Sequence, residues 1–169
     1  MTNFVAVVYL TSLAVLAQTG STMWNFDRDP NNRAPVGFTI DVGDWIVVAD
    51  STAPSAPNVI GQNARNSSPT FNVILSDRAI GKDVDIFVSM KSIAGSIDQG
   101  GGVLWRATDA KNYYIARYNP LENNYRVYKV VNGTRIQLGS AGISGTPGWH
   151  MLRVTRSDDH IECFYDGRK

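Results

Sequence analysis

The 169-residue chain has few of the side chains from which most enzyme centres and metal sites are built. It contains one cysteine, Cys163, and two histidines, His150 and His160. A single cysteine excludes an internal disulfide, so the fold must rely on its hydrophobic core. An ordinary zinc site would need aspartates from distant loops. We expect Cys163 to be a small buried hydrophobe within a strand.

Glutamate is also scarce, which argues against the usual glycosidase centre. The two glutamates are Glu122 and Glu162, and no strand carries the alternating acidic residues of β-glucanases. No G-x-S-x-G nucleophile elbow occurs either. The sequence therefore identifies no catalytic residue and leaves the activity open, with Asp98 and Glu122 as the candidates.

Charge is sparse and balanced, at 18% charged residues and a net charge of +1. A nucleic-acid-binding surface requires a basic stripe or a strongly basic domain, so no nucleic acid is expected as a partner. The chain is 43% hydrophobic, which is enough for one domain with a core of its own.

The N-terminus carries an almost unbroken apolar run over residues 4–17 that closes on Val15-Leu16-Ala17. The run is short for a membrane span and ends in small residues, so it predicts a signal peptide over residues 1–17 and a secreted or periplasmic protein. No membrane association is expected after its removal. The region before the run has no lysine or arginine, and a hydrophobic anchor or a first buried strand stays open as the alternative.

After residue 17 the pattern is of short strands separated by Gly, Pro, Asn and Asp turns, with no helical periodicity longer than a turn. It predicts an all-β, two-sheet antiparallel jelly-roll sandwich. We expect hairpins for residues 38–49 around Gly43, for 125–138 across Asn132-Gly133, and for 150–165. Tyr165-Asp166-Gly167 is a further hairpin signal close to Lys169, which predicts that the last strands of the sandwich are missing.

Trp, Tyr, Arg and Asn accumulate together in residues 98–131, on predicted strands 103–107, 113–118 and 125–131. Sugar rings lie against flat aromatic side chains while their hydroxyls need fixed polar partners, and this block offers both kinds. Alternation separates Tyr114 and Tyr118 from Tyr113, Arg117 and Asn119, without indicating which face is open. Ordinary core packing is the alternative. The candidate ligand-binding residues are Gln99, Trp105, Arg106, Asn112, Tyr114, Arg117, Tyr118, Asn119 and Arg126.

No cofactor is required by the sequence, but calcium is a candidate. Asp27, Asp29 and Asn31 alternate within a loop and offer oxygen ligands, although the glycine and terminal glutamate of an EF-hand are absent. A turn with capped backbone amides is the alternative that we favour.

Three segments carry a family resemblance: GGGVLWRATDAKNYYIARYNPLENNYRVYKVVNGTR, GWHMLRV and IECFYDGRK. They resemble an exported bacterial family of concanavalin A-like domains, named variously 3-keto-disaccharide hydrolase-like or family-16 glycosidase-like. The resemblance implies a lectin-type or glucanase-type sandwich over residues 18–169 that binds or acts on carbohydrate and lacks its closing strands. It matches positions in the central block: Asp98, Gln99, Trp105, Arg106, Asn112, Tyr113, Tyr114, Arg117, Asn119, Glu122 and Arg126. The catalytic carboxylates of the glucanases are not found, so that activity is not carried over.

Three functions follow as hypotheses. The first is an exported carbohydrate-binding or carbohydrate-processing domain that recognises a saccharide through its aromatic and arginine face. The second is a hydrolase of 3-keto-disaccharides or related glycosides, which would use Asp98, Glu122 or a metal-activated water. The third is a structural sandwich that mediates protein contacts.

Overall fold

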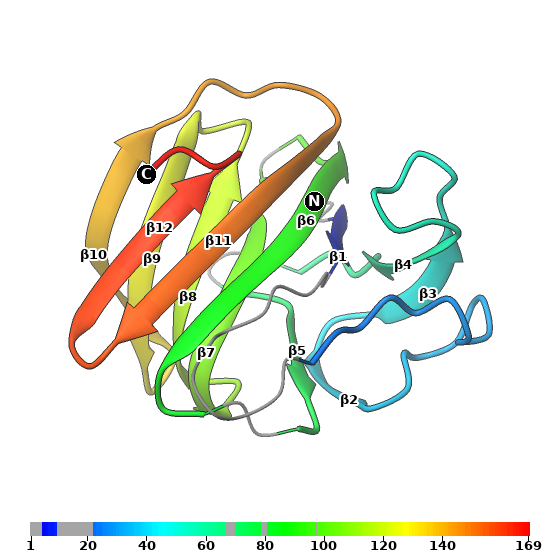
Figure 1. Cartoon of the computed structure of the whole chain (residues 1–169), viewed down its shortest axis with the longest axis horizontal. Helices are drawn as coiled ribbons and strands as arrows, with labels where there is room; N and C mark the ends of the chain where they lie inside the picture. Colours follow the sequence, from blue (N-terminus) through cyan, green and yellow to red (C-terminus); the bar gives the residue numbers. More distant parts are fainter. Residues whose placement is uncertain (1–4, 10–21, 67–69, 79–80, 97) are drawn as a thin grey trace.

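The computed structural model describes residues 5–9, 22–66, 70–78, 81–96 and 98–169. These residues form twelve strands and no helix, and the predicted all-β sandwich is confirmed (Figure 1). All strand pairs within the three sheets are antiparallel. In the part of the chain described, no helix is long and apolar enough to cross a membrane.

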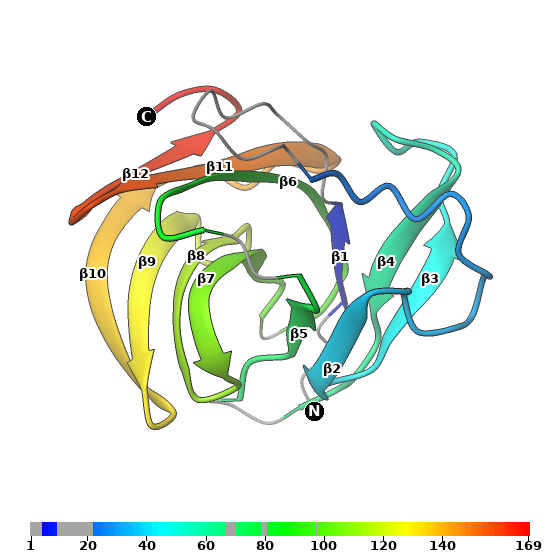
Figure 2. The same cartoon turned by 60° about the horizontal axis from the view of Figure 1, so that its bottom comes forward.

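Two sheets form the layers of the sandwich, and a third, small sheet lies beside them. The back sheet has the order β12 (His160–Tyr165), β11 (Trp149–Ser157), β6 (Val84–Ala94), β1 (Val5–Tyr9), β4 (Asn58–Gln62) and β3 (Trp45–Ala49). The front sheet has the order β10 (Thr134–Gly142), β9 (Asn124–Val131), β8 (Asn112–Asn119) and β7 (Gly101–Asp109). The small sheet pairs β2 (Phe38–Val42) with β5 (Val73–Ser76). Figure 2 shows the front sheet curving beneath β12, β11 and β6.

The main core lies between the two layers. Val88, Met90, Leu152 and Val154 of the back sheet belong to one buried cluster with residues of the front sheet. The front sheet contributes Val103, Trp105, Ala116, Tyr118 and Tyr125. Because side chains alternate along a strand, these residues define the inner face of the front sheet.

The opposite, outer face of the front sheet has an apolar part of its own. Tyr113 and Ile115 of β8 and Tyr128 and Val130 of β9 are buried there with Val73 of β5. Phe71 and Leu75 pack against the same cluster. The segment around β5 therefore covers part of the outer face, and β8 is buried on both sides, which is why its burial does not alternate.

Two predicted hairpins are confirmed and one is wrong. β9 and β10 meet across Asn132 and Gly133, which both have positive φ angles, 49° and 80°, as a two-residue turn of this kind requires. β11 and β12 form the hairpin predicted over residues 150–165.

The hairpin expected across Gly43 does not form. Gly43 adopts a φ of 106°, a conformation that favours glycine, and the chain passes there from the small sheet to the back sheet. On either side of Gly43 the strands have different partners: β2 pairs with β5, and β3 pairs with β4 along its whole length. The five residues of β4 are all buried, so β4 offers β3 more apolar contact than the exposed and half-buried β2 does.

Part of the predicted leader is a strand in this structure. Val5–Tyr9 forms β1, which pairs with β6 on one side and β4 on the other. Residues 1–4 and 10–17 lie outside the described part of the chain, and the signal peptide stays a prediction. At the other end, Asp166 and Gly167 form the predicted turn, closed by a bridge between Tyr165 and Arg168. The missing closing strands also stay a prediction.

Candidate functional site

A cluster of polar and charged side chains occupies the outer face of the front sheet where β8 turns into β9. Alternation carries Arg117 and Asn119 to the same face as Tyr113 and Ile115. The register then sets Arg117 opposite Arg126 and Asn119 opposite Asn124, because opposite residues in an antiparallel pair share a face. With Asp98 and Glu122 from the adjoining loops, these residues form what we call the Arg117 cluster: Asp98, Arg117, Asn119, Glu122, Asn124 and Arg126.

Arg117 is the buried centre of this cluster, with 3% of its side chain exposed. Its Nη2 lies 3.0 Å from Glu122 Oε2 and 3.7 Å from Asp98 Oδ1. The contact with Glu122 is a close ion pair that helps to lower the pKa of Glu122, although the N–H groups on Nη2 and Nε do not point directly at an acceptor among the described residues. Both nitrogens are themselves buried, so the groups of this face that a ligand can reach are Glu122 and Arg126, 38% and 33% exposed.

The loop before β7 lies directly over this guanidinium. A Cβ atom placed on Gly100 would approach Arg117 Nε to 2.3 Å, so any larger residue here would displace the Arg117 side chain. The Gly100 amide donates a hydrogen bond of 2.6 Å to Asp98 Oδ1. The glycine run before β7 therefore shapes the cover of the Arg117 cluster.

The two carboxylates of the cluster have opposite pKa shifts. Burial raises the pKa of Asp98 above its ordinary value, against the charge of Arg117 and the hydrogen bond from Gly100. Burial also acts to raise the pKa of Glu122, but the Asn124 amide, Arg117 and Arg126 together hold it below its ordinary value. Glu122 Oε2 lies 3.0 Å from both Asn124 Nδ2 and Arg126 Nη1. Asp98 Oδ1 also accepts a 2.8 Å hydrogen bond from Asn119.

Aromatic rings adjoin the cluster on the outer face. Arg126 Nη1 lies 3.5 Å from the hydroxyl of Tyr128, and the Tyr128 ring packs against Phe71 at 6.4 Å. The guanidinium of Arg135 lies over the Phe71 ring at 4.6 Å. Flat rings and fixed polar groups therefore share this surface.

A cavity of about 380 Å³ runs beside the cluster along the edge of β7. Arg117, Gly100 and the β7 residues from Gly101 to Ala107 line it. Its other walls come from β2, β3, β4, β5 and β6. Its volume is within the range of small-molecule sites, about 300–1,000 Å³.

The predicted binding residues fall into separate groups. Arg117, Asn119 and Arg126 meet in the Arg117 cluster, with the two carboxylates Asp98 and Glu122 that were the catalytic candidates. Gln99 lies next to the cluster but is held by the loop. Its side-chain Nε2 donates to the backbone oxygen of Gly95 at 2.8 Å, and its backbone oxygen accepts from Ser92 Oγ at 2.9 Å.

The aromatic candidates are on the inner face. Trp105 and Tyr118 are 4% and 1% exposed and belong to the core between the sheets. Tyr114 stacks on Trp105 with ring centroids 5.8 Å apart, and Tyr118 packs against Tyr165 at 4.8 Å. Packing accounts for all three positions, and a ligand contact there stays a prediction; only Trp105 of the three lines the cavity.

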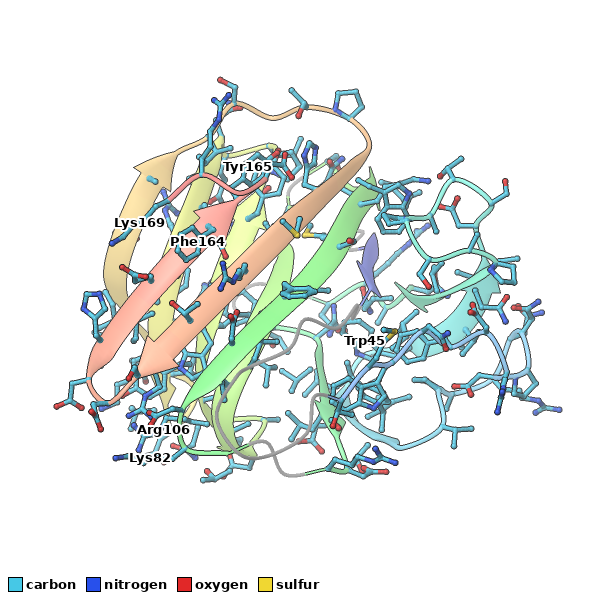
Figure 3. All side chains as sticks on the ribbon, in the orientation of Figure 1. Trp45, Lys82, Arg106, Phe164, Tyr165 and Lys169 are labelled. Atoms are coloured by element: carbon cyan, nitrogen blue, oxygen red, sulfur yellow. The ribbon has the colours of Figure 1, made fainter. Side chains whose placement is uncertain are left out.

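Asn112 and Arg106 lie away from the cluster. Asn112 hydrogen-bonds Asp109 Oδ1 at 3.0 Å and accepts from the Asn132 amide at 3.0 Å, so it fixes two turns. Arg106 is exposed, has a φ of 51°, and stands where the register of β7 with β8 shifts. Figure 3 places it at the lower edge of the molecule, and it lines the cavity.

Sequence reasoning missed Asn124, Tyr128 and Phe71. The register of the hairpin places Asn124 opposite Asn119 and Tyr128 opposite Ile115. The position of the turn between β8 and β9 could therefore have predicted that these residues share a face. Phe71 reaches the outer face because the segment before β5 packs against β8 and β9, and the local sequence does not indicate this long-range contact.

The calcium candidates form a turn. Asp29 Oδ2 accepts a hydrogen bond of 2.8 Å from the Val36 amide, as the capped-turn alternative predicts. Across the described residues, no group of three or more His, Cys, Asp or Glu side chains is arranged to hold a metal ion.

Comparison with known proteins supports the fold. No family model matches the sequence, and no curated protein does. Among solved structures, the chain is similar to the carbohydrate-binding module CBM66 from Bacillus subtilis, with a TM-score of 0.63 and 21% sequence identity. The match covers 81% of this chain and 77% of that one. At this identity the likeness shows a shared β-sandwich fold.

Proposed function

We propose that this protein binds carbohydrate through the Arg117 cluster on the outer face of the front sheet. The observation that carries the proposal is the exposed edge of the cluster, where Arg126 and Glu122, 33% and 38% exposed, lie 3.0 Å apart beside the buried Arg117. The fold supports it, because the similar solved structure is named a carbohydrate-binding module.

The chemistry of the cluster suits neighbouring hydroxyls on one sugar ring. A hydroxyl both donates and accepts, so it can satisfy a guanidinium N–H and a carboxylate oxygen at the same time. Glu122 and the less exposed Asp98 supply the acceptors, and Arg126 supplies the donors, while the buried Arg117 holds the two carboxylates in place. Phe71, which is half-buried, is the adjoining ring for the apolar face of a sugar, and the buried Tyr128 packs against it.

Affinity electrophoresis tests this proposal with a matched pair of variants. Arg126 and Arg153 both pair with a carboxylate and have 33% and 34% exposed side chains, but Arg153 pairs with Asp85 on the back sheet. We expect Arg126→Gln to lose about tenfold in affinity for the retarding polysaccharide, because hydrogen bonds to charged groups contribute roughly 1.5–3 kcal/mol. Arg153→Gln is expected to be retarded like the parent.

The gels would contain soluble β-glucan, xylan or polygalacturonate, and each variant would first be checked for a parental unfolding transition. Equal retardation of Arg126→Gln and the parent would exclude the Arg117 cluster as the binding site. Absence of retardation for the parent across a wider panel of neutral and acidic polysaccharides would count against carbohydrate binding itself.

Hydrolysis of 3-keto-disaccharides or related glycosides is the second candidate. It is favoured by two carboxylates that approach the same nitrogen of Arg117 and have pKa shifts of opposite direction. A glycosidase needs one carboxyl that is protonated and one that is ionised, and such environments separate the two roles. Asp98 would be the acid and Glu122 the base or nucleophile.

Product release from oxidised and ordinary disaccharides distinguishes hydrolysis from binding. Turnover by the parent that is abolished in both Asp98→Asn and Glu122→Gln is the result expected of an enzyme. No turnover of either substrate, together with retained polysaccharide retardation, would leave binding as the function.

We also propose that the protein acts outside the cytoplasm, secreted or periplasmic, after loss of residues 1–17, a cleavage that would remove β1 from between β6 and β4. The support is the apolar run with its small-residue end. N-terminal sequencing of protein recovered from the medium or periplasm should begin at Gln18; an intact N-terminus and retention in the cytoplasm would contradict export.

A further inference from the structure

We propose that the cavity beside β7 is a second ligand site, for an amphipathic anion: a long-chain carboxylate whose apolar chain lies inside and whose charged group lies at the arginines of the wall. This inference rests on the cavity alone and does not depend on carbohydrate binding by the Arg117 cluster.

The body of the cavity is apolar. Side chains from both layers and from the N-terminal segment line it: Trp24, Phe38, Ile60, Ile74, Ile86 and Trp105. The volume is about 380 Å³, so the space accepts a small molecule. Gln62, Asn72 and Ser76 also line the cavity, but most of its wall is apolar, which suits a hydrocarbon chain better than a ring with hydroxyls around its whole edge.

One wall residue lacks a hydrogen-bond partner. The indole of Trp105 is 4% exposed, and its Nε1–H has no acceptor among the described residues. A buried N–H is nearly always paired, by protein, water or ligand. The Nε1 atom is itself buried, so it does not contact a molecule in the cavity, and the polar end of the ligand is inferred from the arginines of the lining.

The charge of the lining determines the sign of that polar end. The charged side chains that line the cavity are Arg78, Arg106 and Arg117, and no described carboxylate lines it. Arg117 has Asp98 and Glu122 as its partners, but Arg78 and Arg106 are exposed and form no ion pair with a described carboxylate. Two unpaired guanidinium groups on an apolar wall favour a carboxylate or similar anion.

The position of Arg106 follows from the backbone. It is the residue of β7 at which the pairing with β8 becomes irregular, and its φ of 51° is rare for a residue other than glycine or asparagine. Bulges of this kind redirect a side chain at a sheet edge, often beside a binding site. Here the redirected side chain is a cation, in a strand whose neighbouring residues form the cavity wall.

Calorimetric titration of the full chain with dodecanoate, below its micelle concentration, tests the proposal. Dodecyltrimethylammonium has the same chain with the opposite charge, and acetate has the charge without the chain. We expect saturable binding of one dodecanoate per chain, at least about tenfold weaker binding of dodecyltrimethylammonium, and no detectable binding of acetate. Equal affinity for the two dodecyl probes, or no binding of dodecanoate, would overturn the proposal.

Three variants locate the site. Arg106→Gln, at an exposed position, should reduce the preference for dodecanoate over the cationic probe about tenfold. Ala107→Trp places a large ring in the cavity and should abolish binding, whereas Arg168→Gln, in the C-terminal turn, should bind like the parent. Parental binding by a folded Ala107→Trp, or an unchanged preference in Arg106→Gln, would overturn the assignment; if Ala107→Trp does not fold, Arg106→Gln decides it.

Discussion

At the scale of single residues, Gly102 shows how closely β7 and β8 approach one another beside the Arg117 cluster. A Cβ atom on Gly102 would lie 1.9 Å from the backbone oxygen of Ala116 on β8. That oxygen is part of the sheet and cannot move away as a flexible side chain could. We expect Gly102→Ala to lower the free energy of unfolding by about 2–4 kcal/mol, measured by urea denaturation.

Gly139→Ala on β10 is the matched control. A Cβ at Gly139 meets no atom within 4 Å, and Gly139 is not among the residues of positive φ. Its unfolding midpoint should stay close to that of the parent, within about 0.5 kcal/mol. Equal effects of the two substitutions would show that the close approach of Gly102 to β8 is not a structural requirement.

Residue types in the central block predicted the site only in part. Arg117, Asn119 and Arg126 were expected to bind because sugar hydroxyls need fixed polar partners, which Arg and Asn side chains supply. Trp105 and Tyr118 carry equally suitable rings, yet they face the core between the sheets. Alternation separates the two sets without indicating which is inside, because that depends on which face the back sheet covers.

At the scale of elements, the turn between β8 and β9 joins the carboxylate of Glu122 to two arginines of the strands. The pKa of folded Glu122 lies below its ordinary value, so the folded state favours the ionised form. This contribution to stability is complete above the ordinary value of 4.5 and is lost as the pH falls through the lower folded value. Glu122→Gln, which has no proton to gain, removes it.

We therefore expect the stability difference between parent and Glu122→Gln to depend on pH. The parent should be the more stable at pH 7, and the difference should shrink when urea midpoints are measured near pH 3. Other carboxylates, such as Asp50 and Glu162, also have lowered pKa values, but they titrate in both proteins and cancel in the comparison. A difference that is constant from pH 7 to pH 3 would contradict the ion-paired role of Glu122.

Strand pairing separates what was predictable from what was not. Asn132-Gly133 specifies its own hairpin, since both residues accept positive φ, and β9 and β10 pair as expected. Residues 38–49 carry no such turn, and β2 pairs instead with β5, more than thirty positions along the chain. Pairing over such distances depends on burial of the assembled sheets, which local sequence does not reveal.

At the scale of the whole molecule, the reactivity of the free cysteine measures how often the two layers of the sandwich separate. Cys163 of β12 pairs with Val154 and packs partly buried against the core between the sheets. Burial raises the pKa of its thiol to about 11. At pH 8 the reactive thiolate of the folded protein is therefore roughly one part in a thousand.

We expect the native protein to react slowly with an aromatic disulfide reagent at pH 8 and rapidly in 6 M guanidinium chloride. If reaction requires the two layers to separate, a distant core substitution should accelerate it. Val88 on β6 is fully buried, and Val88→Ala should cost about 2 kcal/mol, which raises the open population and the labelling rate by an order of magnitude or more. Ile136→Ala, at a position 50% exposed on β10, should leave the rate unchanged. Equal rates for the parent and Val88→Ala would show that β12 opens alone at the sheet edge, and that Cys163 does not report on the sandwich as a unit.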